Sequence, residues 1–163
     1  MNKIKYLLIF LLSFLSCNQE IPIQFTEDAL NDTFTTIEGK NESLKNILTA
    51  HKGKTIIVDI WASWCGDCIK GMPKVKALQE AYPEAIYIFL SLDKTEKAWK
   101  KGIKKYNVQG EHYFMQSGKG SAFGKFVNID WIPRYMVVGS EGKIKLFKAV
   151  EADDKKIKQS LIN

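Results

Sequence analysis

Two cysteines three residues apart, Cys65 and Cys68, stand where an apolar, strand-like run gives way to a helical pattern. Side chains at positions i and i+3 of a helix lie about 5 to 6 Å apart at Cβ, close to the separation that a disulfide needs. A disulfide between them can therefore open and close without unfolding the chain around it. A Cys-x-x-Cys pair between a strand and a helix predicts a redox site.

The two thiols are expected to play different roles. Cys65 would begin the helix, where unpaired backbone N–H groups and the helix dipole favour an anion, so its pKa should fall below about 8.5. We assign Cys65 as the nucleophile and Cys68, one turn inside and less exposed, as the resolving thiol. A structural staple or half of a zinc site is the alternative. However, so local a staple constrains the unfolded chain little, and structural zinc takes about four ligands.

The first sixteen residues are predicted to direct export rather than to fold. Lys3 and Lys5 precede an apolar run, residues 6–15, that has no acidic residue and is too short to span a bilayer. The run ends at Ser16-Cys17, which resembles the lipobox of bacterial lipoproteins. Residues 1–16 would then be a lipoprotein signal peptide and Cys17 the lipidated residue, with an ordinary secretory signal as the alternative. If Cys17 is lipidated, the remaining two of the three cysteines, Cys65 and Cys68, form one pair.

The rest of the chain is predicted to form a tether, residues 17–24, and one domain, residues 25–163. Without the first sixteen residues, which hold two lysines and no acid, 22 basic and 18 acidic side chains remain. The excess lies mainly in residues 94–105 and is typical of a solvated helix face, so no nucleic-acid partner is expected. Outside the cytoplasm disulfides persist, so such a site either oxidises its partners or is kept reduced by a membrane electron donor.

Strand-like and helix-like segments alternate along the domain. Residues 55–60 and 85–92 are near-continuous apolar runs, which predicts two buried parallel strands. Further strands are expected at 34–37, 132–138 and 143–150, and helices after Asn41 or Ser43, after the cysteines with a kink at Pro73, at 99–106, around 123–127 and at 153–162. We therefore expect an α/β fold with a mixed central sheet, helices on both faces, and a C-terminal β-hairpin followed by a helix.

Four motifs together resemble the thioredoxin superfamily. They are Val-Asp-Ile-Trp-Ala at 58–62, Trp-Cys-Gly-Asp-Cys at 64–68, Pro73 five residues after the second cysteine, and Ile132-Pro133 before a strand. The resemblance covers roughly residues 30–163 and implies a thioredoxin-like fold. The lipoprotein signal, the lead-in at 40–53 and the stretch around Trp99 are most similar to the membrane-anchored TlpA and ResA group of thiol-disulfide oxidoreductases.

The resemblance implies roles for residues beyond the cysteines. Pro133 would be the cis-proline that packs against the disulfide and leaves the backbone of Ile132 free to pair with an extended substrate. Asp59 would be the buried acid that moves a proton to or from the resolving thiol, and desolvation should raise its pKa. The alternatives are a strand-leading proline and a solvent-facing aspartate. The chain departs from its group at Gly71, where a glutamate is usual, and Phe89 takes the place of a lysine common in thioredoxins.

The residues around the cysteines are expected to tune the redox potential and to contact substrate. Asp67 competes with the thiolate for the helix end and so favours a reductant, whereas strong oxidases typically have histidine there. Trp61 and Trp64 would shield the disulfide and shape a shallow apolar docking surface, although either could be core. Gly66 and Ile132 complete the expected substrate contacts.

Several functions remain open from the sequence. The leading one is a periplasmic, lipid-tethered reductase of disulfides in exported proteins, with apocytochromes c as candidate clients and a membrane electron donor. A Cu(I)-handling module using the cysteines with Met115 or His112, a disulfide oxidase and a thiol peroxidase are alternatives. His51 and His112 have no metal-ligand spacing, so no metal and no cofactor beyond the redox-active disulfide is expected.

Overall fold

The structure is a computed structural model that describes residues 21–162. The predicted signal peptide and the predicted lipidation site Cys17 lie outside the described residues and stay predictions. In chain order the elements are α1 (Glu27–Asn31), β1 (Thr33–Thr36), β2 (Asn41–Ser43), α2 (Leu44–Ala50), β3 (Ile56–Trp61), α3 (Gly66–Ala81), β4 (Ile86–Ser91), α4 (Glu96–Tyr106), β5 (Glu111–Phe114), the 3₁₀ helix η1 (Gly118–Gly120), α5 (Ala122–Phe126), β6 (Arg134–Val138), β7 (Ile144–Ala149) and α6 (Lys155–Ile162).

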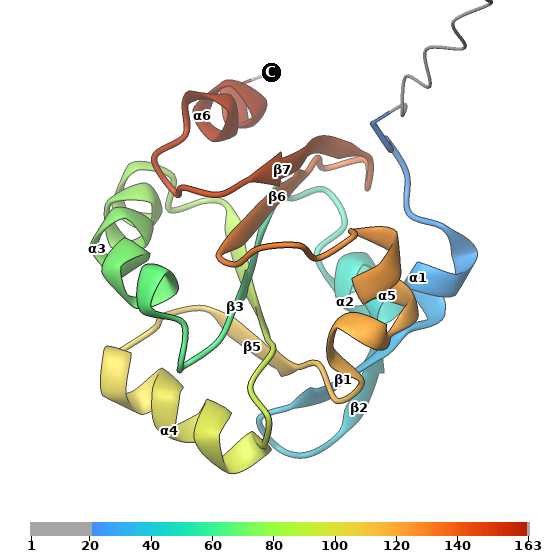
Figure 1. Cartoon of the computed structure of the whole chain (residues 1–163). Helices are drawn as coiled ribbons and strands as arrows, with labels where there is room; N and C mark the ends of the chain where they lie inside the picture. Colours follow the sequence, from blue (N-terminus) through green and yellow to red (C-terminus); the bar gives the residue numbers. More distant parts are fainter. Residues whose placement is uncertain (1–20, 163) are drawn as a thin grey trace, which may run out of the picture.

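A seven-stranded sheet in the order β2-β1-β5-β4-β3-β6-β7 organises the molecule (Figure 1). The strands β3, β4 and β5 run parallel to one another, whereas β6 pairs antiparallel with β3 and then with β7. All six residues of β3 are buried, as its continuous apolar sequence predicts. The mixed sheet and its C-terminal hairpin and helix are therefore confirmed.

Helices cover both faces of the sheet (Figure 1). On one face, the Tyr87 hydroxyl donates to the Leu78 carbonyl in α3 at 2.9 Å, and Trp99 of α4 stacks on a β5 ring. On the other face, Arg134 of β6 donates to the carbonyl of Val127 just after α5 at 2.9 Å, and His51 at the end of α2 contacts a β5 carboxylate. The helix α3, which begins at the cysteines, therefore packs on the face of the sheet that carries the Tyr87 side chain.

Three of the short elements were not predicted. The strands β2 and β5 and the helix α1 have three, four and five residues, too few for a periodic pattern to stand out. The helix α3 continues through Pro73, so the prediction that this proline does not end the helix is confirmed. The end of the predicted tether also contacts the sheet, because the Ile144 amide donates to the Ile23 carbonyl at 2.9 Å. Within residues 21–162, the helices are all too short or too polar to cross a bilayer.

Gly102 allows α4 to pack against the turn that precedes Cys65. A Cβ at position 102 would lie 2.4 Å from Cβ of Ser63, so Gly102→Ala must displace one of the two segments. We expect this substitution to lower the free energy of unfolding in urea by about 1 to 3 kcal/mol, the usual cost of overpacking. Gly120→Ala is the control, because no atom lies within 4 Å of its added Cβ. Equal stability of the two variants would contradict this view of the α4 contact.

Candidate active site

A disulfide between Cys65 and Cys68 stands at the start of α3. The Cα atoms are 5.3 Å apart, and Sγ of Cys65 accepts the Cys68 backbone N–H at 3.0 Å, so Cys65 is the N-cap of the helix. Cys65 is 6% exposed and Cys68 only 1%, which leaves Cys65 the more accessible sulfur. When the bond is reduced, the capping N–H and the helix dipole stabilise a thiolate on Cys65 more than on Cys68.

The loop before β6 lies against this disulfide. The carbonyl oxygen of Ile132 is 3.6 Å from Sγ of Cys65, and the Ile132–Pro133 peptide bond is cis, as the family resemblance implies. Among the described residues, the Ile132 amide makes no backbone hydrogen bond. The Ile132 backbone therefore lies next to the reactive sulfur with its N–H unused in the backbone hydrogen bonds of this region.

Two exposed tryptophans lie beside the reactive sulfur. Trp64, directly before Cys65, is 60% exposed, and Trp131, directly before Ile132, is 57% exposed. The prediction that Trp61 shapes the docking surface is wrong, because its side chain is fully buried in the core. Trp131 was missed, although its place before the Ile-Pro motif could have indicated it. Gly66 is exposed and has open space above its Cα, so the helix start is accessible.

Asp59 is buried beneath α3. It is 3% exposed, and neither carboxylate oxygen has a hydrogen-bond partner. Its cross-strand neighbour Tyr135 reaches toward α3, where a Cβ on Gly71 would be 3.8 Å from the Tyr135 hydroxyl. Directly opposed residues point to the same face, so Asp59 lies under the helix that carries Cys68 one turn before Gly71. The solvent-facing alternative for Asp59 is therefore excluded.

The surroundings of Asp59 disfavour its charged form. Burial raises the pKa of Asp59 from 3.8 to about 8, and the nearby Tyr135 hydroxyl offsets a smaller part without forming a complete hydrogen bond. The other cross-strand neighbour, Phe89, offers no counter-charge. The raised pKa agrees with the expectation from the sequence and brings this carboxyl into the range where it can exchange protons near neutral pH.

Asp67 and Asp93 act on the start of α3 in different ways. Asp67 is an exposed acid in the first turn, and its carboxylate is 3.8 Å from Nζ of Lys70. Asp93, at the carboxyl end of β4, is buried and accepts the Ser63 amide at 3.0 Å and the Ser63 hydroxyl at 2.6 Å. Asp93 thereby fixes the turn that leads into Cys65. It was missed, although an acid that follows a buried parallel strand next to the site is a signal for such a role.

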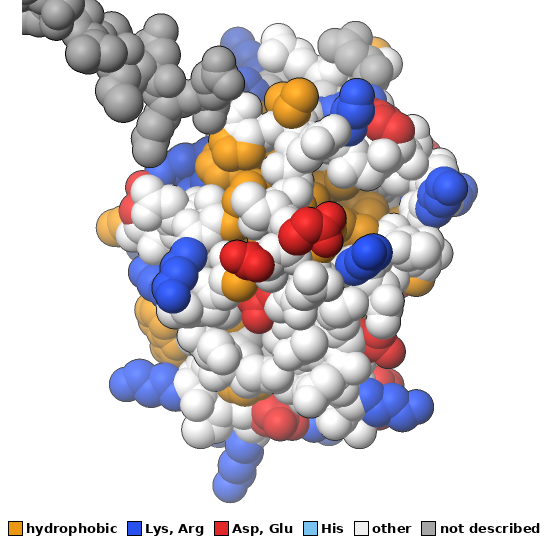
Figure 2. Space-filling view, turned by 90° about the vertical axis from the view of Figure 1, so that its right-hand side faces the viewer, with side chains coloured by type: hydrophobic (Ala, Val, Ile, Leu, Met, Phe, Trp, Pro, Cys, Tyr) orange, Lys and Arg blue, Asp and Glu red, His pale blue; other side chains and the backbone are white. Residues whose placement is uncertain are grey.

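Other polar features lie away from the cysteines. His112 stacks on Phe89 and its Nε2 is 3.1 Å from the Val108 carbonyl, and His51 pairs with Glu111 at 3.0 Å. Within residues 21–162, no group of three or more His, Cys, Asp or Glu could hold a metal ion. Basic and acidic side chains are interspersed on the face seen in Figure 2.

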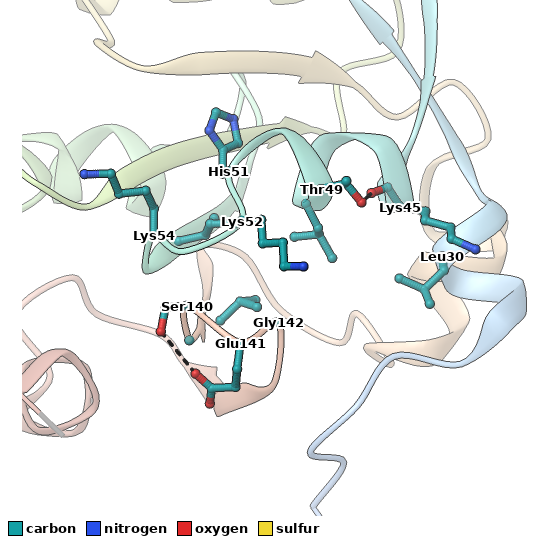
Figure 3. Close-up of a pocket in the computed structure, with 13 residues that line it drawn as sticks. Leu30, Lys45, Thr49, His51, Lys52, Lys54, Ser140, Glu141 and Gly142 are labelled. Atoms are coloured by element: carbon teal, nitrogen blue, oxygen red, sulfur yellow. Dashed lines mark hydrogen bonds between the residues drawn. The ribbon is translucent and has the colours of Figure 1, made fainter.

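A hollow of about 300 Å³ lies at the opposite end of β3 from the cysteines, between the end of α2 and the β6–β7 turn (Figure 3). Ile56, which begins β3, and Val138, which ends the antiparallel β6, both line it. Cys65 follows the other end of β3. The length of β3 therefore separates this hollow from the redox pair.

Comparisons with known proteins match this geometry. A family model described as thioredoxin-like matches residues 53–144. A thiol-disulfide oxidoreductase ResA of Bacillus cereus is 29% identical over 124 residues, 75% of this chain and 68% of that protein. A Bacteroides vulgatus protein assigned as a thiol-disulfide oxidoreductase is 30% identical with a TM-score of 0.68, over 84% of this chain and 88% of that one.

A second Bacteroides vulgatus structure, the thioredoxin domain of a thiol-disulfide oxidoreductase, has a TM-score of 0.68 at 23% identity and covers 86% of this chain and all of that domain. At this identity the likeness concerns the fold alone. Together the matches confirm the predicted thioredoxin-like fold and the resemblance to ResA-type proteins that the sequence motifs carry.

Proposed function

The chain belongs to the thioredoxin-like family and is a thiol-disulfide oxidoreductase, and we propose that it works as a reductant of disulfides in exported proteins. The observation that carries this direction of electron flow is Asp67, an acid in the first turn of α3 that opposes negative charge on Cys65 and so destabilises the reduced form. The capping contact, in which Sγ of Cys65 accepts a helix N–H at 3.0 Å, favours a thiolate on the more exposed cysteine, and attack on a client disulfide requires that thiolate.

The catalytic cycle uses both sulfurs. The Cys65 thiolate attacks a client disulfide, whose S–S bond breaks as a mixed disulfide forms and one client cysteine leaves as a thiolate. Asp59 then takes the proton of Cys68, and Sγ of Cys68 attacks Sγ of Cys65, which releases the second client thiolate. The client gains two electrons and the protein loses two, ending as the Cys65–Cys68 disulfide. A dithiol electron donor at the membrane returns the protein to its reduced form.

The surface around Cys65 suits an unfolded or extended client. The free Ile132 amide can pair with a client backbone, and Trp64 and Trp131 offer apolar, amphipathic contact area on either side. Backbone pairing reads little sequence, so varied polypeptides are accepted. The predicted signal peptide and Cys17 anchor support an exported protein held at the membrane of the cell envelope, facing the periplasm, and apocytochromes c are candidate clients there.

The reduction potential tests this direction of electron flow. In equilibrium with glutathione, we expect a value closer to that of thioredoxin, about −270 mV, than to that of strong oxidants, about −120 mV. The reduced protein should also reduce insulin disulfides with dithiothreitol as electron source. A potential near that of the strong oxidants would assign the protein as an oxidase instead.

Asp67 should keep this potential low. Its carboxylate stands in the first turn of α3, where it opposes the negative charge on Cys65, and Lys70 at 3.8 Å pairs with it only weakly because both are exposed. We expect Asp67→His to raise the potential by about 30 to 60 mV, because about 30 mV corresponds to 1.4 kcal/mol for this couple. Glu96→His, the same change in the first turn of α4, is the control and should leave the potential unchanged.

A further inference from the structure

A small hollow of about 80 Å³ opens beside the redox site, between α3 and the segment that follows β7. Gly71 and Asp67 of α3, Trp131, Tyr135 and Glu151 are among its lining residues. Tyr135 is the member of this set that also stands directly opposite Asp59 in the β3–β6 register. The hollow has room for water, and its polar rim would supply hydrogen-bond partners.

Because Asp59 is buried, the proton that its carboxyl gains and loses needs a route to solvent. The proposed cycle charges and discharges this carboxyl once per turnover, but its side chain is buried and neither oxygen has a hydrogen-bond partner. Of its two cross-strand neighbours, Phe89 has no exchangeable proton. Tyr135 has one, stands opposite Asp59 in the β3–β6 register, and also lines the hollow.

We propose that Tyr135 relays the proton between Asp59 and water in this hollow, a role that rests on the proposed function of Asp59 as the acid and base of the cycle. When the protonated Asp59 discharges, the two side chains first close to a hydrogen bond; the Asp59 proton then passes to the Tyr135 oxygen while the hydroxyl proton of Tyr135 passes to a water molecule in the hollow. Recharging follows the same path in reverse. Tyr135 ends each transfer as a neutral phenol, so no redox change and no net charge falls on it.

The groups around Tyr135 fit a neutral relay. Burial raises the pKa of Tyr135 well above its ordinary value, and the charge of Asp59 acts in the same direction, so the phenol does not ionise. Beyond the hollow, Glu151 and Asp153 share Lys74 of α3 at 2.7 and 3.2 Å. These acids, together with Asp67, make the mouth of the hollow polar.

Gly71 keeps this path open. A Cβ there would sit 3.8 Å from the Tyr135 hydroxyl, an ordinary contact, but a longer side chain would cover the hydroxyl and fill the hollow. The position is the one at which the chain departs from the glutamate usual in its group. With no carboxylate at position 71, the proposed path from Asp59 to the hollow runs through the tyrosine hydroxyl.

Carbon-13 NMR of aspartate carboxyls in the oxidised protein, titrated between about pH 6 and pH 10, tests the relay. Asp59→Asn assigns the resonance by its loss. In the wild type, we expect one Asp59 signal that moves continuously with pH, because proton exchange with water is fast on the NMR timescale. In Tyr135→Phe, the exchange rate should fall at least tenfold, so that the signal broadens or splits into separate protonated and ionised peaks.

Gly71→Leu provides a second test that keeps both Tyr135 and Asp59. It should slow the exchange as Tyr135→Phe does, whereas Gly71→Ala and Lys76→Leu, on the exposed side of α3, should leave it fast. A tyrosine that only packs or hydrogen-bonds would change the midpoint of the titration and not the exchange rate. Fast exchange in both Tyr135→Phe and Gly71→Leu would overturn the relay.

Insulin turnover separates this outcome from failure of the proposed function. If Asp59→Asn reduces insulin as fast as the wild type, Asp59 is not the acid and base of the cycle, and the relay falls with it. If Asp59→Asn is slow while exchange stays fast in the two relay variants, the role of Asp59 stands and the relay alone is refuted.

Discussion

Cys68→Ala is expected to stop the protein at a mixed disulfide between Cys65 and its client. Without the resolving sulfur, residues 21–162 hold no second thiol that can attack the Cys65–client bond, so the adduct persists. Steady-state insulin reduction should fall by about a thousandfold or more, as expected when one member of a catalytic unit is removed. Non-reducing electrophoresis followed by mass spectrometry of the trapped species measures the accumulation and names the clients.

Cys65→Ala is the matched control for this trap. It retains the buried Cys68, which is 1% exposed and lacks the capping N–H, so few or no adducts should form. Trapped clients should carry export signals and cysteine pairs, and a dithiol electron donor should be among them. Equal trapping by both variants would show that Cys68 can serve as the nucleophile, and clients drawn only from the cytoplasm would contradict export.

Much of this site could be predicted because its signals are local. The apolar run that ends in β3, the Cys-x-x-Cys spacing and the helical pattern of α3 follow one another directly, so the redox pair and the buried Asp59 could be placed from the sequence. The alternation of side chains along a strand also predicts the position of Trp61. It stands two residues after Asp59 on one strand, so the two side chains share a buried face. Grouping Trp61 with Trp64 by residue type led to the wrong assignment.

The residues that were missed depend on contacts between distant segments. Tyr135 acquires its position from the register of β6 against β3, and Asp93 from hydrogen bonds to the turn at Ser63. Nothing in the local sequence distinguishes this tyrosine from an ordinary strand residue. The short strands β2 and β5 likewise owe their existence to pairing with β1 and β4 and not to a strong pattern of their own.

In the oxidised protein, Asp59 should make the free energy of unfolding fall as the pH rises. The folded state holds the Asp59 proton up to a pKa of about 8, whereas the unfolded chain releases it near 3.8. This contribution to stability is therefore complete below about pH 4 and is lost progressively as the pH rises through about 8. Because each pKa unit corresponds to about 1.4 kcal/mol, the loss is on the order of 6 kcal/mol.

Asp59→Asn should remove this slope, since the amide stays neutral at every pH. We expect the variant to match the wild type near pH 4 and to exceed its free energy of unfolding by roughly 6 kcal/mol at pH 9, measured by urea denaturation of the disulfide-bonded form. Asp130→Asn is the control of opposite sign, because its hydrogen bond with Lys148 lowers the pKa of Asp130. That variant should gain nothing at high pH.

Parallel pH profiles for Asp59→Asn and the wild type would show that the carboxyl is hydrated in solution, and the case for a buried acid would fail. A difference in the free energy of unfolding that grows from pH 4 to pH 8 would instead show that ionising the buried carboxyl destabilises the fold. The burial that destabilises the ionised carboxylate is the same burial that moves its pKa to the range where Cys68 must lose a proton. A more stable Asp59→Asn protein should therefore also be the slower reductant.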